Sequence, residues 1–410
     1  MFTPEKIEKY VMDNKDEAIS LIVEAIQSPS PTGFEQPMGK TMKKWIESAG
    51  LEAKCYCYDQ DRPNFIADWN GTNAGKEGSK KFLFNGHMDV FPPTAKDDPD
   101  YNPWSGEIKD GFIYGRGASD MKGGDCAAMM AVKFLKEMGF DPNGTITLNY
   151  VSDEENGGKY GVNSLLDEGF LNADFGISME PTDNKMKIGH GAIYPCKITV
   201  YGDGGSSSEP IVPNDIDNIY GGEDAIKKGM KAVAALNGIQ DNILSKKETK
   251  YGTHLSVTKI NAGKAVNNYA RECVICIDRR FSSPETVESV DKEICDALDA
   301  VKKTDPTFTY KFEGFYEPMT PEFTVDLESE VVKAVEASYK EVYDGKEIEK
   351  YTMPGGSDMA FVHAKYGFET PWFGPGNHNG VAGSFENLSI DNYLKCIMVY
   401  MNTLVKLMSK

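Results

Sequence analysis

Residues 81–90 read KFLFNGHMDV, an apolar run that ends in an imidazole and a carboxylate. Residues 81–86 have the composition of a buried strand, and His87 and Asp89 follow where the chain would leave the sheet. Because side chains two apart on a strand point the same way, both groups would project to one side. A metal-binding histidine usually donates its second ring N–H to a carboxylate, so Asp89 is a candidate orienter of His87. Taken alone, such a pair is more often a hydrogen-bonded turn than a metal site.

Length, charge and cysteine content limit the classes of protein. The chain has 410 residues, 40% of them hydrophobic, which allows a large core and two or three domains. Its formal net charge of -19 argues against nucleic-acid and anionic-membrane partners. We expect neither a membrane span nor a signal peptide, because no long apolar run and no leader pattern is found. The eight scattered cysteines are typical of reduced thiols and favour a cytoplasmic location.

The pattern of elements predicts an α/β domain with a second unit inserted in it. Helices are expected at 5–27 and 36–49, and strands then alternate with helices, which indicates a mixed sheet flanked by helices. The expected strands are 64–69, 81–86, 145–151 and 174–179, and the helices are 122–138 and 160–168. From about 190 to 313 four strands and two helices form an α+β unit of ferredoxin-like type. The predicted domains are therefore 1–188 with 316–410, and 189–315.

Three further acidic signals follow expected strands or turns. The glycine-rich turn 115–124 holds Asp120, and its spacing fits neither phosphate-binding pattern, so a carboxylate ligand is the better interpretation. The run Ser152 to Glu155 contains three adjacent acids, which face water or a cation because they repel one another. A solvated acidic turn is the alternative for this run. Glu180 ends a strand, at the edge where α/β sheets place their ligands.

His87, Asp120, Glu155 and Glu180 together predict a metal centre. A set of imidazole and carboxylates without cysteine suits zinc, with cobalt or manganese as alternatives. Two ions about 3.5–4 Å apart, bridged by Asp120, fit this set best. Of the adjacent glutamates, one can bind metal while Glu154 accepts a proton from water.

With these residues the sequence resembles the cocatalytic zinc amidohydrolases and metallopeptidases that include aminoacylase, acetylornithine deacetylase, succinyl-diaminopimelate desuccinylase and the glutamate carboxypeptidases. The resemblance covers nearly the whole chain. It rests on ordered motifs, namely His87-Met88-Asp89, residues 115–124, Asp153-Glu154-Glu155, Glu180-Pro181-Thr182, residues 263–267, Asp278-Arg279-Arg280 and residues 355–358. It implies that His87 and Glu180 bind one metal, that Glu155 binds the other and that Asp120 bridges them. It also implies that Asp89 orients His87, that Glu154 is the general base and that the peptide bond 120–121 is cis.

The resemblance further implies that 189–315 is a lid and dimerisation domain, and hence a homodimer. Asn267 and Arg280 match lid positions that contact the carboxylate or reacting carbonyl of the substrate. The alternative for Arg280 is a structural ion pair with Asp278. Gly355, Gly356 and Ser357 match a substrate-lining turn, for which a plain turn is the alternative.

Two positions depart from the family pattern. Ser206 stands where relatives have a lid histidine, and loss of one oxyanion donor typically costs about 100- to 1000-fold in rate. The last metal-binding histidine of relatives follows a Gly-Pro-Gly turn, here residues 374–376. One alignment puts Gly383 at that position, and the other gives the role to His378, which we favour. Without His378, the metal ion bound by Glu155 would be held weakly, and a centre with a single metal ion would be expected.

The sequence therefore predicts a metal-dependent hydrolase of an amide or peptide bond in a small substrate with a carboxylate. An N-acyl amino acid or a short peptide fits that description. The alternative is a catalytically impaired relative that binds metal or ligand in a regulatory role. Glu154 argues against this alternative, because a non-catalytic descendant has little need of an unpaired base beside a ligand.

Overall fold

The chain folds into two compact units, described one at a time below. The computed structural model describes residues 2–59, 61–93, 101–208, 224–246, 252–314, 320–377 and 385–410. Unit 1 comprises Met1–Gly189, Phe323–Thr352 and Ser357–Lys410, and unit 2 comprises His190–Glu322 and Met353–Gly356.

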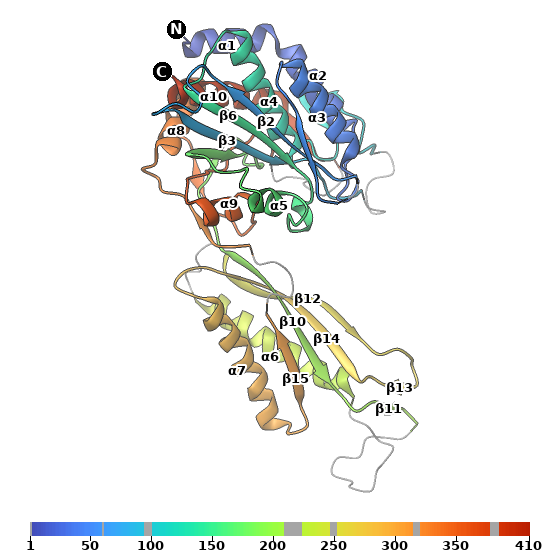
Figure 1. Cartoon of the computed structure of the whole chain (residues 1–410). Helices are drawn as coiled ribbons and strands as arrows, with labels where there is room; N and C mark the ends of the chain where they lie inside the picture. The colour runs from blue at the N-terminus through green and yellow to red at the C-terminus, as the bar shows by residue number, and fades with distance from the viewer. Residues whose placement is uncertain are drawn as a thin grey trace. The chain divides into compact units, whose positions relative to one another are not determined.

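Unit 1 contains a mixed five-stranded sheet, as predicted (Figure 1). Its strands are β1 (Lys54–Cys57), β2 (Pro63–Asn70), β3 (Lys80–His87), β6 (Gly144–Val151) and β7 (Phe175–Ser178), in the order β1-β2-β6-β3-β7. The strands β6, β3 and β7 are mutually parallel, whereas β1 and β2 run antiparallel to their neighbours. The carboxyl ends of the three parallel strands therefore meet at one edge of the sheet.

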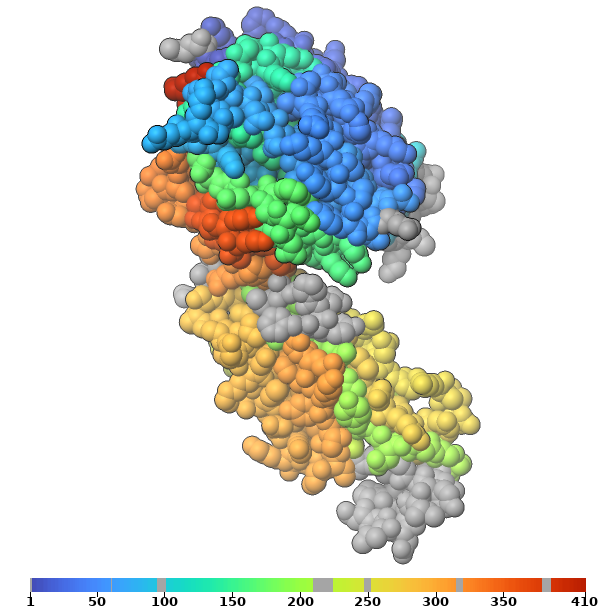
Figure 2. Space-filling model, viewed as in Figure 1, coloured from blue at the N-terminus to red at the C-terminus, as the bar shows by residue number. Residues whose placement is uncertain are grey.

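Helices cover both faces of this sheet. The two faces separate along β3, where Phe82 and Phe84 join one apolar core and Leu83 joins the other. The larger core lies under α1 (Pro4–Asp13), α2 (Lys15–Ile26), α3 (Gln36–Ser48), α4 (Lys122–Glu137), α8 (Glu330–Val342) and α10 (Ile390–Met408). The smaller core lies under α5 (Val162–Asp167) and α9 (Met359–Tyr366). The N-terminal segment, blue in Figure 2, forms a continuous part of the surface of unit 1.

The single helix predicted at 5–27 is wrong, because α1 and α2 are separate helices. Asn14 lies between them with φ -115° and ψ 18°, outside the helical region. Its side-chain amide donates a hydrogen bond to the carbonyl of Tyr10 (2.8 Å). Asparagine competes in this way for backbone groups at helix ends, which apolar spacing alone does not reveal.

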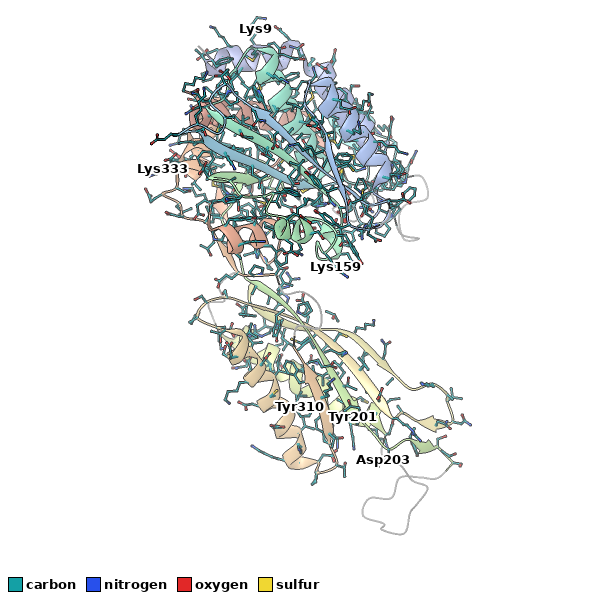
Figure 3. All side chains as sticks on the ribbon, in the orientation of Figure 1. Lys9, Lys159, Tyr201, Asp203, Tyr310 and Lys333 are labelled. Carbon is teal, nitrogen blue, oxygen red and sulfur yellow. The ribbon has the colours of Figure 1, made fainter. Side chains whose placement is uncertain are left out.

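Unit 2 is a four-stranded antiparallel sheet with two helices. Along the chain it runs β10 (Ala192–Tyr201), α6 (Ala225–Ser245), β12 (His254–Ala262), β14 (Glu272–Phe281), α7 (Val287–Thr304) and β15 (Thr309–Glu313). The sheet order β12-β14-β10-β15 with this succession is the ferredoxin-like arrangement. Figure 3 labels Tyr201 on β10 and Tyr310 on the edge strand β15.

The division differs from the predicted one at residues 320–322 and 353–356, which cluster with unit 2, and at Gly189, which clusters with unit 1. Arg280 on β14 donates a hydrogen bond to the carbonyl of Pro354 (2.8 Å). A Cβ atom on Gly356 would lie 2.5 Å from Ile193 Cδ1, so a larger residue at this position would have to displace that side chain of β10. These contacts join residues far apart in sequence, which local patterns do not encode.

Shorter elements complete the two units. They are β4 (Glu107–Lys109), β5 (Phe112–Tyr114), β8 (Met186–Lys187), β9 (Gly189–His190), β11 (Gly205–Ser206), β13 (Asn268–Tyr269), β16 (Phe323–Thr324), β17 (Lys350–Tyr351), β18 (Asn387–Ser389) and a 3-10 turn at Glu154–Asn156. All eight cysteines are free thiols. Within the described part of the chain, none of the helices combines the length and apolar character needed to cross a bilayer.

Candidate metal centre

The parallel strands of unit 1 bring the predicted ligands to one edge of the sheet. His87 is the last residue of β3, the turn holding Glu155 follows β6, and Glu180 follows β7. Asp120 comes from the turn before α4. His87 Nε2 lies 3.2 Å from Asp120 Oδ1 and 4.0 Å from Glu180 Oε2. One potential ligand atom each from His87, Asp120 and Glu155 all lie within 4.8 Å of one another.

The donor atoms suit a divalent ion such as zinc. Imidazole and carboxylate donors bind zinc at about 2.0–2.1 Å, so two tetrahedral ligands are roughly 3.3 Å apart. The 3.2 Å between His87 Nε2 and Asp120 Oδ1 matches that spacing. The residues present therefore fit the group that the sequence predicts.

The charges of this cluster also favour a cation. Burial, together with the Asp120 charge, raises the pKa of Glu155 to about 9. Burial likewise raises the pKa of Glu180 to about 7 and that of Glu154 well above its usual value. Burial works to lower the pKa of His87, but the surrounding carboxylates, Asp120 first, raise it well above its usual range. Buried carboxylates that hold protons for want of positive charge would release them to a metal ion.

We expect the affinity for metal to fall as the pH is lowered from about 9 toward 7. Glu155, with a pKa of about 9, and Glu180, with a pKa of about 7, must lose their protons before their oxygens can bind an ion. Metal uptake near neutral pH should therefore release protons. Calorimetric zinc titrations in buffers of different ionisation enthalpy measure that release. The variant Glu155→Gln should release fewer protons, and a wild-type affinity independent of pH would contradict the prediction.

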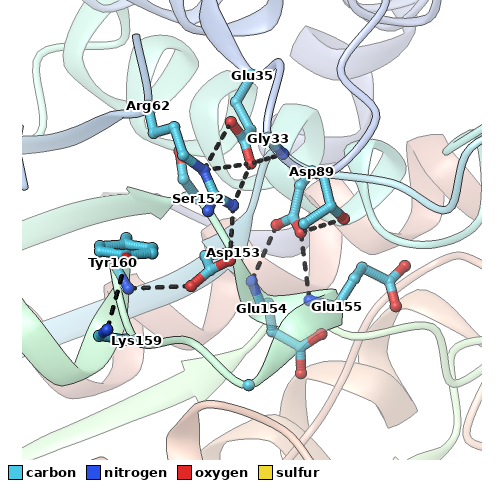
Figure 4. Close-up of polar contacts among 12 residues, drawn as sticks. Gly33, Glu35, Arg62, Asp89, Ser152, Asp153, Glu154, Glu155, Lys159 and Tyr160 are labelled. Atoms are coloured by element: carbon cyan, nitrogen blue, oxygen red, sulfur yellow. Dashed lines mark hydrogen bonds and ion pairs between the residues drawn. The ribbon is translucent and has the colours of Figure 1, made fainter. Parts of the chain in front are cut away.

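Asp89 holds the centre together in two ways. His87 Nδ1 lies 2.8 Å from the backbone carbonyl of Asp89, and a bond donated there leaves Nε2 free to bind metal. The Asp89 carboxylate is farther from Nδ1, at 3.6 Å. It instead accepts hydrogen bonds from the Thr32 hydroxyl (2.9 Å) and the backbone amides of Glu154 (3.1 Å) and Glu155 (3.2 Å) (Figure 4). The same residue thus contacts the His87 ring and fixes the acidic turn.

A buried carboxylate fixes the turn that holds Asp120. Glu386 accepts hydrogen bonds from the backbone amides of Ser119 (3.0 Å) and Asp120 (3.1 Å), and Arg116 donates to its other oxygen (3.0 Å). The peptide bond Asp120–Met121 is cis, as the family resemblance implied.

Glu154 lies beside the predicted ligands. Its Oε2 is 3.8 Å from His87 Nε2, and its side chain is 16% exposed, so water can reach it. Ser357, predicted to line the substrate, is buried, and its hydroxyl lies 3.2 Å from that of Ser178 and bonds to Glu180. Its contact with substrate stays a prediction.

The other residues predicted to contact substrate belong to unit 2. Arg280 forms an ion pair with Asp278 (2.9 Å), the structural pairing that the sequence left open. Asn267 is exposed, and its carbonyl accepts a hydrogen bond from the Ser207 amide (2.9 Å), next to Ser206. Gly355 and Gly356 lie in the segment that clusters with unit 2. Their contacts with substrate stay predictions.

Both candidates for the last ligand, His378 and Gly383, lie outside the described residues. The assignment of His378 as the second ligand of the Glu155 side therefore stays a prediction.

Sequence reasoning missed the buried residues that support the acidic turn. Arg62 and Glu35 come from separate segments and match no motif, yet Arg62 pairs with Asp153 of the turn and Glu35 pairs with Arg62. The signal that was present is electrostatic, because three adjacent acids repel one another and favour a nearby cation.

Comparison with known proteins shows the family of this chain. A family model described as peptidase family M20/M25/M40 matches residues 83–406. Succinyl-diaminopimelate desuccinylase of Paracoccus denitrificans is 30% identical over 304 residues, covering 70% of this chain and 74% of its own.

Solved structures share the fold. A metallo-carboxypeptidase of the M20 family from Sulfolobus solfataricus has a TM-score of 0.72 and 21% identity, with 95% of this chain and 98% of that chain covered. A dinuclear metal-binding peptidase of the M20 family from Bacillus subtilis has a TM-score of 0.67 and 15% identity, with 95% and 97% covered. At these sequence identities, the structural similarity shows a shared fold and nothing more.

Proposed function

The chain belongs to the peptidase family M20/M25/M40, whose members hydrolyse peptide or acyl-amino-acid bonds, and on this premise we propose that it hydrolyses an N-acyl amino acid or a short peptide with a free carboxylate. The proposal includes a centre of two zinc ions, with cobalt or manganese as substitutes. A single ion is the expectation if His378 does not bind.

The observation that carries the proposal is the placement of Glu154 beside the ligand cluster. Its Oε2 lies 3.8 Å from His87 Nε2. One carboxylate oxygen each of Asp120 and Glu155 lies within 4.8 Å of a ring nitrogen of His87. A carboxylate next to a metal centre, but not needed as a ligand, is suited to proton transfer.

In the proposed reaction, the metal centre and Glu154 have separate roles. Bound ions would lower the pKa of a water molecule and polarise the scissile carbonyl. Glu154 takes a proton from the attacking water and returns it to the leaving nitrogen.

The family resemblance implies that Asn267 and Arg280 contact the substrate carboxylate or the reacting carbonyl, and we assign the carboxylate to Arg280. A guanidinium fork can bind both carboxylate oxygens, although Arg280 would first have to leave Asp278 or share it. We also propose that residues 189–315 act as a lid and dimerisation domain. The protein would then be a homodimer, and we place it in the cytoplasm.

The test is turnover by the zinc-, cobalt- or manganese-loaded protein on a panel of N-succinyl and N-acetyl amino acids and dipeptides. We expect activity on at least one class, abolished by a chelator and restored by metal. Esterified substrates serve as matched controls, because they lack the free carboxylate. Stoichiometric metal binding without turnover on any substrate would favour the regulatory alternative.

A further inference from the structure

The first acid of the Asp153-Glu154-Glu155 run differs from the other two. Asp153 has φ 74°, a left-handed backbone conformation that few residues other than glycine adopt. Figure 4 shows its carboxylate directed toward Arg62, whereas the side chains of Glu154 and Glu155 point away from Arg62. The change of direction within three residues depends on what holds Asp153.

Arg62 holds Asp153 through a buried pair of ionic contacts. Arg62 Nη2 lies 2.6 Å from Asp153 Oδ1 and 2.7 Å from Glu35 Oε1, and Nε donates to both Glu35 oxygens at 3.2 Å. The exposed fractions of the three side chains are 7%, 1% and 0%. A guanidinium has enough donors to serve two carboxylates at once, which an ammonium group matches poorly.

Further hydrogen bonds make Asp153 the fixed point of the turn. Its second oxygen accepts from the amide of Tyr160 (3.0 Å), and its carbonyl accepts from the amide of Gly158 (2.7 Å). Lys159, labelled in Figure 3, lies between these residues and is exposed, so the turn faces water on its outer side. The turn is thus held inward by Arg62 and, one residue later, by Asp89 at the amides of Glu154 and Glu155.

We propose that Arg62 is a positioning residue, which aims Glu154 and Glu155 at the metal centre by fixing Asp153. The inference rests on the proposed function for its kinetic part and on the metal centre alone for its binding part. Without Arg62, the buried carboxylates of Asp153 and Glu35 would lose the cation that pairs with both, and Asp153 would turn toward water. We expect such a turn to shift the two glutamates that follow.

The test compares Arg62→Met and Arg62→Lys with the wild type by two readouts, cobalt titration followed by visible absorption and steady-state kinetics. For Arg62→Met we expect cobalt affinity and kcat to fall by about 10- to 100-fold, as for other outer-shell partners of metal ligands, with KM nearly unchanged. Arg62→Lys should recover part of both losses, because it restores the charge but not the fork.

The double variant Arg62→Met/Glu154→Gln separates positioning from general damage. If Arg62 acts on turnover through Glu154, it should add little to the loss in kcat caused by Glu154→Gln. Independent effects would multiply. Asp153→Asn supplies a second test in case Arg62→Met does not fold, since it keeps the size of the side chain and weakens the same ion pair.

Lys133→Met is the matched control. Lys133 on α4 is also mostly buried, 8% exposed, with two carboxylate partners, Glu17 (3.0 Å) and Glu137. Its loss should lower stability but leave cobalt affinity and kcat of the folded protein unchanged. Wild-type cobalt binding and kcat in both Arg62→Met and Asp153→Asn would overturn the inference. If the wild type hydrolyses no substrate, the proposed function fails, and cobalt titration still decides the role of Arg62.

Discussion

Replacement of Glu154 by glutamine should lower kcat by about 100- to 10,000-fold, the contribution typical of a positioned proton-transfer group. Glutamine keeps the size of the side chain and its place beside His87, but it cannot accept a proton from water. Metal content should stay at the wild-type value, because the proposal assigns ligation to Glu155 and not to Glu154. Steady-state kinetics and elemental analysis of the same preparation measure both quantities.

The control for this variant is Glu349→Gln, the same chemical change at a side chain that is 62% exposed and paired with Lys185. It should leave both kcat and metal content unchanged. Turnover by Glu154→Gln at the wild-type rate would remove Glu154 as the base. Loss of metal from Glu154→Gln would instead make it a ligand.

Asp120→Asn should have the largest effect on metal binding. Asp120 is the proposed bridge, so loss of its charge should weaken the binding of both metal ions. His87→Ala should weaken the binding of only one. We expect affinity to fall by more than the roughly 10- to 100-fold that outer-shell changes cost. Metal equivalents retained after dialysis should therefore rank wild type, then His87→Ala, then Asp120→Asn, and activity should follow the same order.

Asp68→Asn is the matched change within the same sheet. Asp68 on β2 pairs with Lys54 at 3.0 Å and takes no part in the centre. It should retain the wild-type metal content. An Asp120→Asn protein that keeps all its metal would refute the bridging assignment.

Local sequence patterns predicted the part of the centre that lies at strand ends. His87 ends β3 and Glu180 lies two residues after the end of β7, so the apolar runs before them were enough to place both residues at one edge of a mixed sheet. The α/β class and the family followed from those residues and their order, and the family match confirmed the resemblance. Asp120 needed its glycine-rich surroundings as well.

Contacts between distant segments were beyond this reasoning. The pairing of Arg62 with Glu35 and Asp153 joins three separate segments, and no spacing rule connects them. The Asp89 carboxylate was predicted to orient His87, yet the nearest group to the ring nitrogen is the Asp89 carbonyl, and backbone contacts of this kind depend on the exact path of the loop. Residues 353–356 cluster with unit 2 also because of contacts with distant segments, which local sequence patterns do not encode.

The double attachment at Asp89 has a mechanical consequence. One residue is bonded both to the histidine ring and to the amides of the turn that holds Glu154 and Glu155. We therefore expect thermal displacement of the end of β3 to carry the His87 ring, Glu154 and Glu155 together. Their separations should then vary less than the position of any one of them, which would preserve the spacing that the proposed proton transfer needs.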